Sequence, residues 1–250
     1  MSYKGLVNRP FVARLKQGQL RPLFIRLYFI KRRIKGLLLH KNVHAIARKY
    51  RAYTMIPKKN FIDNLLLVSR VYDLPGCVVE CGVWRGGMSA GIAEVLGPHR
   101  HYHLFDSFEG LPEAKEIDGP AALQWQSDKQ SPNYHDNCRA EMEFGKRAMA
   151  MSPAKRVTFK KGWFNETLPG FVPDEGIAVL RLDADWYEST MQCLETLYKH
   201  VVTGGVVIID DYYTWDGCTK AVHDFLSANR LPDRIRQTRT GVCYIVRDTI

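Results

Sequence analysis

The chain has 250 residues, of which 46% are hydrophobic and 25% are charged. That apolar fraction is enough for a buried core and excludes a chain that is disordered throughout. No hydrophobic run approaches the roughly 20 residues of a membrane-spanning helix, and Lys and Arg interrupt the apolar residues of the N-terminus, unlike in a signal peptide. We therefore expect a cytoplasmic protein with one large α/β domain.

The net charge of +10 is concentrated at the N-terminus. Residues 1–62 contain 16 Lys and Arg and no Asp or Glu, whereas residues 63–250 contain 20 basic and 26 acidic residues. This asymmetry predicts a basic N-terminal arm, residues 1–50, followed by a mildly acidic domain, residues 51–250.

Within the arm, residues 20–50 have the periodicity of an amphipathic helix, with apolar side chains at three- and four-residue steps from Leu20 to Leu38. Two interpretations remain open. The helix could pack against the domain or a second subunit, in line with an expected homo-oligomer. Alternatively, its basic residues could lie on the anionic inner surface of a membrane. We favour the packed helix.

After the arm, predicted helices alternate with predicted strands. In chain order we expect helix 60–71, strand 77–82, helix 89–96, strand 101–105, helix 137–151, strand 156–160, strand 177–182, helix 187–200, strand 205–209, helix 217–228 and two β runs, 234–238 and 242–246. This alternation predicts an α/β fold with a mostly parallel seven-stranded sheet and helices on both faces. The two final runs fit an antiparallel C-terminal hairpin strand.

Residues 107–136 interrupt the alternation and are too long for an ordinary connection between a strand and a helix. The segment is rich in Pro, Gly and aromatic residues. Long loops at the ligand end of such a sheet are often lids or substrate-binding elements. We favour a lid, and a decorative insertion is the alternative.

Six cysteines are spread along the chain without a Cys-x-x-Cys pair: Cys77, Cys81, Cys138, Cys193, Cys218 and Cys243. In a chain without a secretion signal, such cysteines are normally reduced. We therefore expect free thiols and no zinc site.

The residues after the first two predicted strands favour an adenosine-bearing cofactor. Glycines at 82, 86 and 87 allow a tight turn and close approach of a ligand, but NAD, FAD, a phosphate or S-adenosylmethionine would all suit such a turn. The spacing is not Gly-x-Gly-x-x-Gly, and Glu80 suits a cationic ligand better than a pyrophosphate. Asp106 follows the second strand, where an acid binds ribose hydroxyls, although it could instead cap a turn.

Four acidic residues follow two later strands: Asp183, Asp185, Asp210 and Asp211. If those strands are parallel neighbours, the four carboxylates meet at the ligand end of the sheet. Their mutual repulsion requires a counter-cation, and Mg²⁺ prefers such oxygen ligands, whereas zinc prefers His and Cys. The alternative is helix capping by Asp185 and Asp211, which leaves the other two carboxylates unexplained.

Six ordered segments together resemble the macrocin O-methyltransferase family, which methylates sugars in macrolide and aminocoumarin assembly: residues 53–56, 79–87, 104–112, 161–169, 182–190 and 209–212. The resemblance implies a Rossmann-like class I methyltransferase fold that binds S-adenosylmethionine and Mg²⁺. It implies a cofactor pocket shaped by Thr54, Met55, Glu80, Gly82, Trp84, Ser89, Asp106, Ser107, Gly162, Trp163 and Asp183. It further implies Mg²⁺ ligands at Asp183, Asp210 and Asp211, with Asp185 as the catalytic general base.

The activity implied by the resemblance is O-methylation of a hydroxyl on a sugar, a glycosylated natural product or another glycan. Two alternatives remain open: a catechol-type enzyme that methylates a phenol, and a membrane-docked or nucleic-acid-binding protein that retains the methyltransferase fold. The complete aspartate set argues against the second, because a binding protein has no need of a costly carboxylate cluster. We expect a small-molecule or glycan acceptor and no sequence-specific nucleic-acid partner.

Overall fold

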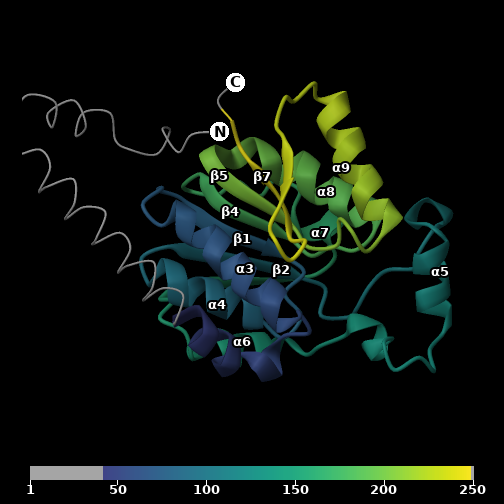
Figure 1. Ribbon diagram of the computed structural model, residues 1–250, viewed down its shortest axis with the longest axis horizontal. Helices are drawn as coiled ribbons and strands as arrows, with labels where there is room; N and C mark the ends of the chain where they lie inside the picture. The colour runs from purple at the N-terminus through teal and green to yellow at the C-terminus, as the bar shows by residue number, and fades with distance from the viewer. Residues whose placement is uncertain (1–41, 249–250) are drawn as a thin grey trace, which may run out of the picture. The chain divides into compact units, whose positions relative to one another are not determined.

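The computed structural model describes residues 42–248, which are built around a seven-stranded sheet (Figure 1). The strand order is β3-β2-β1-β4-β5-β7-β6. The strands are β1 (Cys77–Cys81), β2 (His101–Asp106), β3 (Arg156–Lys161), β4 (Ile177–Leu182), β5 (Val201–Ile209), β6 (Ile235–Gln237) and β7 (Cys243–Val246). β1 to β5 pair in parallel, while β7 pairs antiparallel with β5 and β6. The predicted sheet and its C-terminal hairpin are therefore confirmed.

The central strands are buried over their full length, as their apolar sequences predict. Cys81 is the register partner of Leu182, which in turn is the partner of Ile209. The residues that follow β1, β4 and β5 therefore leave the sheet next to one another. One pair of charged residues breaks the apolar pattern, because Glu80 on β1 lies opposite Arg181 on β4.

The helices form two groups on either side of the sheet (Figure 1). The first group consists of α3 (Lys58–Val68), α4 (Gly87–Leu96) and α6 (Met142–Ala150), and the second of α7 (Phe164–Thr167), α8 (Tyr187–Leu197) and α9 (Asp216–Ala228). α9 is typical in burying apolar residues at three- and four-residue steps, among them Cys218, Ala221, Val222 and Phe225. Short 3₁₀ helices cover η1 (Arg51–Tyr53), η2 (Ser69–Val71) and η5 (Tyr198–His200).

Residues 107–136, predicted as a long insertion, form a folded segment around α5 (Pro120–Ser127) and η3 (Glu116–Asp118) (Figure 1). The buried carboxylate of Asp118 attaches this segment to the rest of the domain. It accepts backbone N–H groups from Lys115 at 2.8 Å and from Tyr187, the first residue of α8, at 2.7 Å. The indole N–H of Trp186 also donates to the carbonyl of Pro112 at 2.9 Å.

The prediction of one helix over residues 137–151 is wrong at its N-terminal end, because α6 begins at Met142. Asp136, Asn137 and Cys138 have φ values of 52°, 53° and 59°. Successive residues in this left-handed region cannot continue into a right-handed helix. They belong instead to a left-handed turn, the segment labelled η4 (His135–Cys138).

The compact unit that contains the sheet begins at Val43, and residues 42–49 are helical. Val43, Ile46 and Tyr50 are buried, and the hydroxyl of Tyr50 donates to Glu94 on α4 at 2.9 Å. The end of the predicted arm is therefore part of the domain. The remainder of the predicted amphipathic helix lies outside the described residues, so its role and the expected oligomer stay predictions.

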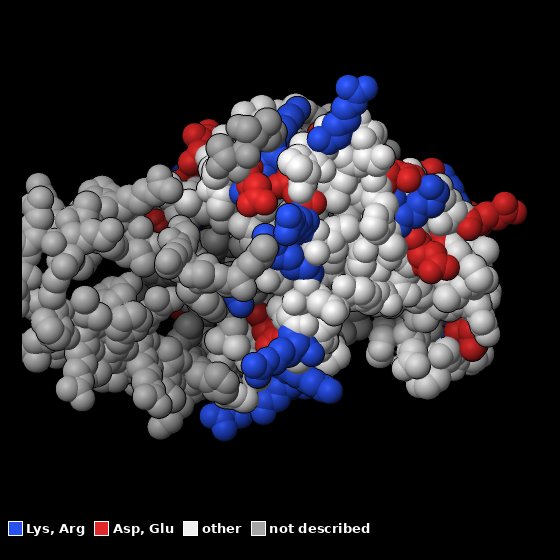
Figure 2. Space-filling model, turned by 45° about the horizontal axis from the view of Figure 1, so that its top comes forward, with Lys and Arg blue, Asp and Glu red and all other residues white. Residues whose placement is uncertain are grey.

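All six cysteines lie within the described residues and are free thiols, as predicted. Among residues 42–248, no helix combines the length and the apolar character needed to cross a bilayer. On the face seen in Figure 2, basic and acidic side chains of the described residues are interspersed.

Candidate active site

The carboxyl ends of the central strands open into a cavity of about 810 Å³, at the edge where parallel sheets bind ligands. All but three of the predicted site residues line it: Met55, Gly82, Trp84, Asp106, Ser107, Gly162, Trp163, Asp183, Asp185, Asp210 and Asp211. The remaining three, Thr54, Glu80 and Ser89, are buried and do not line the cavity.

The turn after β1 depends on glycine at position 82. Gly82 has a φ of 86°, and a Cβ at this position would collide with the backbone carbonyl of Asp183. The N–H of Asp183 also donates to the carbonyl of Cys81 at 2.8 Å. The glycine turn and the first aspartate after β4 are therefore in direct contact.

Asp106, at the end of β2, stabilises both the turn after β1 and the start of the loop that follows β2. Its carboxylate accepts the backbone N–H groups of Val83 at 2.6 Å, Trp84 at 2.8 Å and Phe108 at 2.6 Å. Burial raises the pKa of Asp106, and these three hydrogen bonds oppose that shift. Asp106 thus has a structural role in shaping the turn, and its predicted contact with ribose stays a prediction.

Arg181 is a functional candidate that the sequence analysis missed. Its fully buried guanidinium contacts carboxylates of Glu80 at 2.8 Å, Asp183 at 2.8 Å and Asp210 at 2.7 Å. The hydroxyl of Ser89 donates to the other oxygen of Glu80. Arg is almost never buried without a charged partner, so a single Arg inside the apolar sequence of β4 was the available signal.

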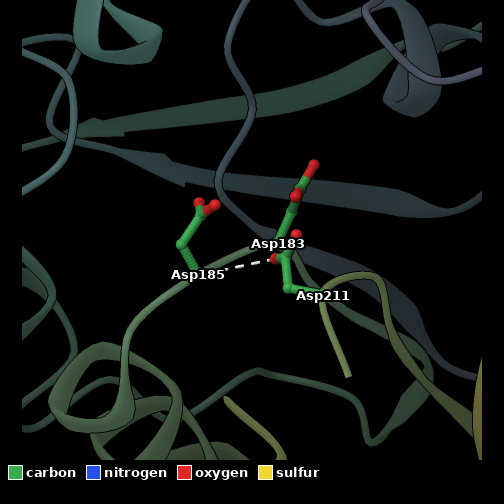
Figure 3. Close-up of side chains that lie close together, drawn as sticks. All are labelled: Asp183, Asp185 and Asp211. Carbon is green, nitrogen blue, oxygen red and sulfur yellow. Dashed lines mark hydrogen bonds between the residues drawn. The ribbon is translucent and has the colours of Figure 1, made fainter. Parts of the chain in front are cut away.

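Three carboxylates converge at the ends of β4 and β5 (Figure 3). One oxygen each from Asp183, Asp185 and Asp211 lies within 4.8 Å of the other two. The backbone N–H of Asp185 donates to Oδ2 of Asp211 at 3.2 Å, the bond drawn in the figure. Asp185 has a φ of 55°, a left-handed conformation that Asp tolerates better than most residues.

This convergence perturbs the acidity of the cluster. Burial, and then the charge of Asp183, raises the pKa of Asp185 to about 8. Burial, and then the charge of Asp185, raises the pKa of Asp211. Like charges at this separation cannot all ionise without compensation. The cluster therefore favours either bound protons or a cation.

The fourth carboxylate, of Asp210, contacts Arg181 instead of joining the cluster. Burial raises the pKa of Asp210 to about 6, and the Arg181 guanidinium opposes this shift. The structure thus groups the predicted base, Asp185, with two of the predicted metal ligands and pairs the third ligand with Arg181.

The clustered donors suit a hard divalent cation. Each of Asp183, Asp185 and Asp211 offers a carboxylate oxygen, and Mg²⁺ favours one or two carboxylates plus water and substrate oxygens. The set found among the described residues contains none of the His or Cys ligands typical of zinc. The residues present therefore fit the predicted magnesium.

The order of the strands, with a ligand cavity at their carboxyl ends, defines a class I methyltransferase fold. The macrocin O-methyltransferase family model matches residues 40–245. The chain belongs to this family and is an O-methyltransferase.

Comparison with individual proteins agrees with that assignment. The chain is 38% identical over 205 residues to the 8-demethyl-8-(2,3-dimethoxy-alpha-L-rhamnosyl)-tetracenomycin-C 4'-O-methyltransferase of Streptomyces olivaceus, covering 77% of this chain and 75% of the relative. It is 34% identical over 200 residues, with the same coverage, to the demethyldecarbamoylnovobiocin O-methyltransferase of Streptomyces niveus. Its fold is similar to the solved structure of the O-methyltransferase NovP, with a TM-score of 0.67, 31% identity and coverage of 79% of this chain and 83% of NovP. The predicted family, fold and enzyme class are confirmed.

Proposed function

We propose that this enzyme transfers the methyl group of S-adenosylmethionine to a sugar hydroxyl of a glycosylated natural product, with Mg²⁺ bound by its aspartates. The observation that carries the proposal is the convergence of Asp183, Asp185 and Asp211 beside a cavity of about 810 Å³. The names of the relatives support the acceptor class, since one of them methylates a rhamnosyl-tetracenomycin compound at its 4' oxygen.

The inner part of the cavity is the proposed cofactor site. Bound S-adenosylmethionine would supply a methyl group on an electrophilic sulfonium. The proposed lining is Met55, Gly82, Trp84, Asp106, Ser107, Gly162, Trp163 and Asp183. The indole N–H of Trp84 is buried without a hydrogen-bond partner among the described residues, which is expected where a ligand provides the acceptor. Thr54, Glu80 and Ser89 would support this wall from behind.

For the metal we propose Asp183 and Asp211 of the cluster, with Asp210, the neighbour of Asp211 after β5, as the third ligand, because we assign Asp185 as the base. Mg²⁺ bound there would lower the pKa of the acceptor hydroxyl and orient it. Asp210 would keep Oδ1 on Arg181 and offer its other oxygen. Arg181 also contacts Asp183, so it would hold two of the three ligands in place.

The proposed role of Asp185 is to accept the proton of the acceptor hydroxyl. Its carboxylate lines the cavity and lies in the cluster with Asp183 and Asp211. A positioned general base typically contributes about 10²- to 10⁴-fold in rate. The cavity would hold the hydroxyl in line with the methyl group, and such positioning supplies much of the remaining acceleration.

The test of this function is transfer of labelled methyl groups from S-adenosylmethionine to a panel of deoxysugar glycosides, polysaccharides and phenols. We expect sugar-bearing acceptors to be labelled in Mg²⁺, no labelling in EDTA, and recovery when Mg²⁺ is added back. Full turnover in EDTA would contradict the metal, and labelling confined to phenols would contradict the acceptor class.

Variants separate the proposed ligands from the proposed base. Asp183→Asn should lose both activity and Mn²⁺ binding, measured by electron paramagnetic resonance. Asp185→Asn should lose about 10²- to 10⁴-fold in kcat and still bind Mn²⁺. The control is Asp73→Asn, because Asp73 is an exposed carboxylate in the turn before β1. Loss of Mn²⁺ binding in Asp185→Asn would make Asp185 a ligand.

A further inference from the structure

Three tryptophans from separate parts of the chain form one aromatic cluster beside the aspartates. Trp186 follows β4, Trp215 precedes α9, and Trp125 belongs to α5 in the segment 107–136. The ring centroids of Trp186 and Trp215 are 5.2 Å apart, and that of Trp125 is 5.8 Å from Trp215. All of these contacts are edge-to-face, an arrangement that favours aromatic pairs.

Two indole N–H groups of this cluster donate to backbone carbonyls, and the third donates to a carboxylate. Trp125 donates to the carbonyl of Asn133 at 2.9 Å, and Trp186 to the carbonyl of Pro112 at 2.9 Å. Both acceptors are backbone groups of the segment 107–136. Trp215 instead donates to a carboxylate in the cavity, Oδ1 of Asp185, at 2.9 Å.

The position of the Trp215 indole is itself restrained. Its ring is packed against two other indoles, and its backbone N–H donates to the carbonyl of Asp211 at 3.0 Å. Asp185 is also joined to Asp211, through its own backbone N–H. The donor and the carboxylate are therefore fixed to the same residue, and the hydrogen bond between them restricts rotation of the Asp185 side chain.

A carboxylate held through one oxygen presents the other in a defined direction. Asp185 lines the cavity, whereas Trp125 and Trp215 are not part of its lining. Trp215 therefore reaches the cavity through its hydrogen bond to the Asp185 carboxylate. The segment 107–136 lines the cavity with other residues, among them Ser107 and Leu111.

We propose that Trp215 is a positioning residue that orients the carboxylate of Asp185 toward the acceptor hydroxyl. The proposal rests on the role of Asp185 as the base.

The experiment compares Trp215→Phe with the matched control Trp125→Phe in the full-length chain. Both substitutions keep an aromatic ring in the same cluster and remove one indole N–H, but only Trp215 donates to Asp185. Measurements are kcat and KM with Mg²⁺ and a sugar acceptor, S-adenosylmethionine affinity by calorimetry, Mn²⁺ affinity, and the thermal midpoint of unfolding. A third variant, Trp215→His, keeps a ring N–H donor at this position.

We expect Trp215→Phe to lower kcat by about 10- to 100-fold, the range that corresponds to losing one hydrogen bond to a charged group. Affinities for S-adenosylmethionine and Mn²⁺ should stay within about twofold of wild type. Trp125→Phe should keep its kcat, and Trp215→His should exceed Trp215→Phe in kcat. If Trp215→Phe is unstable, Trp215→His is compared with wild type instead. That variant is still expected to lose kcat while its affinities for S-adenosylmethionine and Mn²⁺ stay unchanged.

Two results would overturn the inference in distinguishable ways. A kcat of Trp215→Phe as high as that of wild type and of Trp125→Phe would remove Trp215 from the chemical step, while a low kcat of Asp185→Asn would leave the proposed base standing. A parallel loss of kcat and Mn²⁺ affinity in Trp215→Phe would mean that Trp215 orients a metal ligand, and the proposed role of Asp185 would fall with it.

Discussion

Replacing Arg181 by Met should destabilise the protein by about 3–5 kcal/mol, the usual cost of removing one partner from a buried ion pair. Met matches much of the length of Arg but carries no charge. The substitution therefore leaves three carboxylates, of Glu80, Asp183 and Asp210, without the cation that they share in the structure.

Most of this cost should come from Glu80. Its side chain is only 1% exposed, whereas those of Asp183 and Asp210 are 29% and 21% exposed and can recover solvation. The contributions of those two are discounted accordingly. Because a domain of this kind is stable by about 5–15 kcal/mol, the variant should still fold in the absence of denaturant.

The destabilisation should also depend on pH. Burial raises the pKa of Glu80, and Arg181 opposes that shift. Without Arg181 the pKa of folded Glu80 rises further above its value in the unfolded chain, so the folded state binds a proton that the unfolded state releases. With Arg181 present the pKa of Glu80 is about 8, so both proteins lose stability up to that pH and only the variant continues to lose it above. The cost of the substitution should therefore be larger at about pH 9.5 than at about pH 7.

The assay is urea unfolding of wild type, Arg181→Met, Glu80→Gln and the double variant at both pH values, all without metal. The double variant removes the cation together with its most buried anion, so it should be more stable than Arg181→Met alone at the higher pH. The reasoning would be refuted if Arg181→Met lay within about 1 kcal/mol of wild type at the higher pH, well below the expected cost, or if the double variant were the less stable of the two.

Three further predictions concern the site and its surroundings. Because burial raises the pKa of Asp185 from 3.8 to about 8, thermal stability in EDTA should fall as pH increases between these values; Asp185→Asn should flatten this dependence, and an unchanged slope would contradict the shift. Gly82→Ala should not bind S-adenosylmethionine in calorimetry, and its free energy of unfolding should fall by more than about 3 kcal/mol, the upper end of the usual cost of backbone strain. The reason is that its Cβ would collide with Asp183, and wild-type affinity would contradict this close contact. Asp118→Ala should lower the free energy of unfolding by about 1–2 kcal/mol, as for loss of a helix cap. It should also raise KM for the acceptor, because Asp118 holds the segment 107–136 to Tyr187. An unchanged KM would mean that this segment does not contribute to acceptor binding.

The positions of the site residues along the fold were predictable from the sequence. The apolar runs of β1, β4 and β5 identify buried parallel strands, and residues that follow such strands meet at one edge of the sheet. Gly82, Asp106 and Asp183 could therefore be assigned to a common site before any contact was known. The helix boundary at Met142 was missed because apolar periodicity does not reveal left-handed residues such as Asn137.

The sequence by itself thus determined the class of fold, the edge of the sheet that binds ligands and the acids gathered there, because hydrophobic periodicity and the order of helices and strands along the chain are local properties. Only the tertiary structure decided how those acids are divided. Arg181 reaches Glu80, 101 positions away, and also takes Asp210, while Asp185 receives a hydrogen bond from Trp215, 30 positions away. Such pairings depend on side-chain directions and on burial that forces charges to find partners across the fold, and no spacing along the chain encodes them.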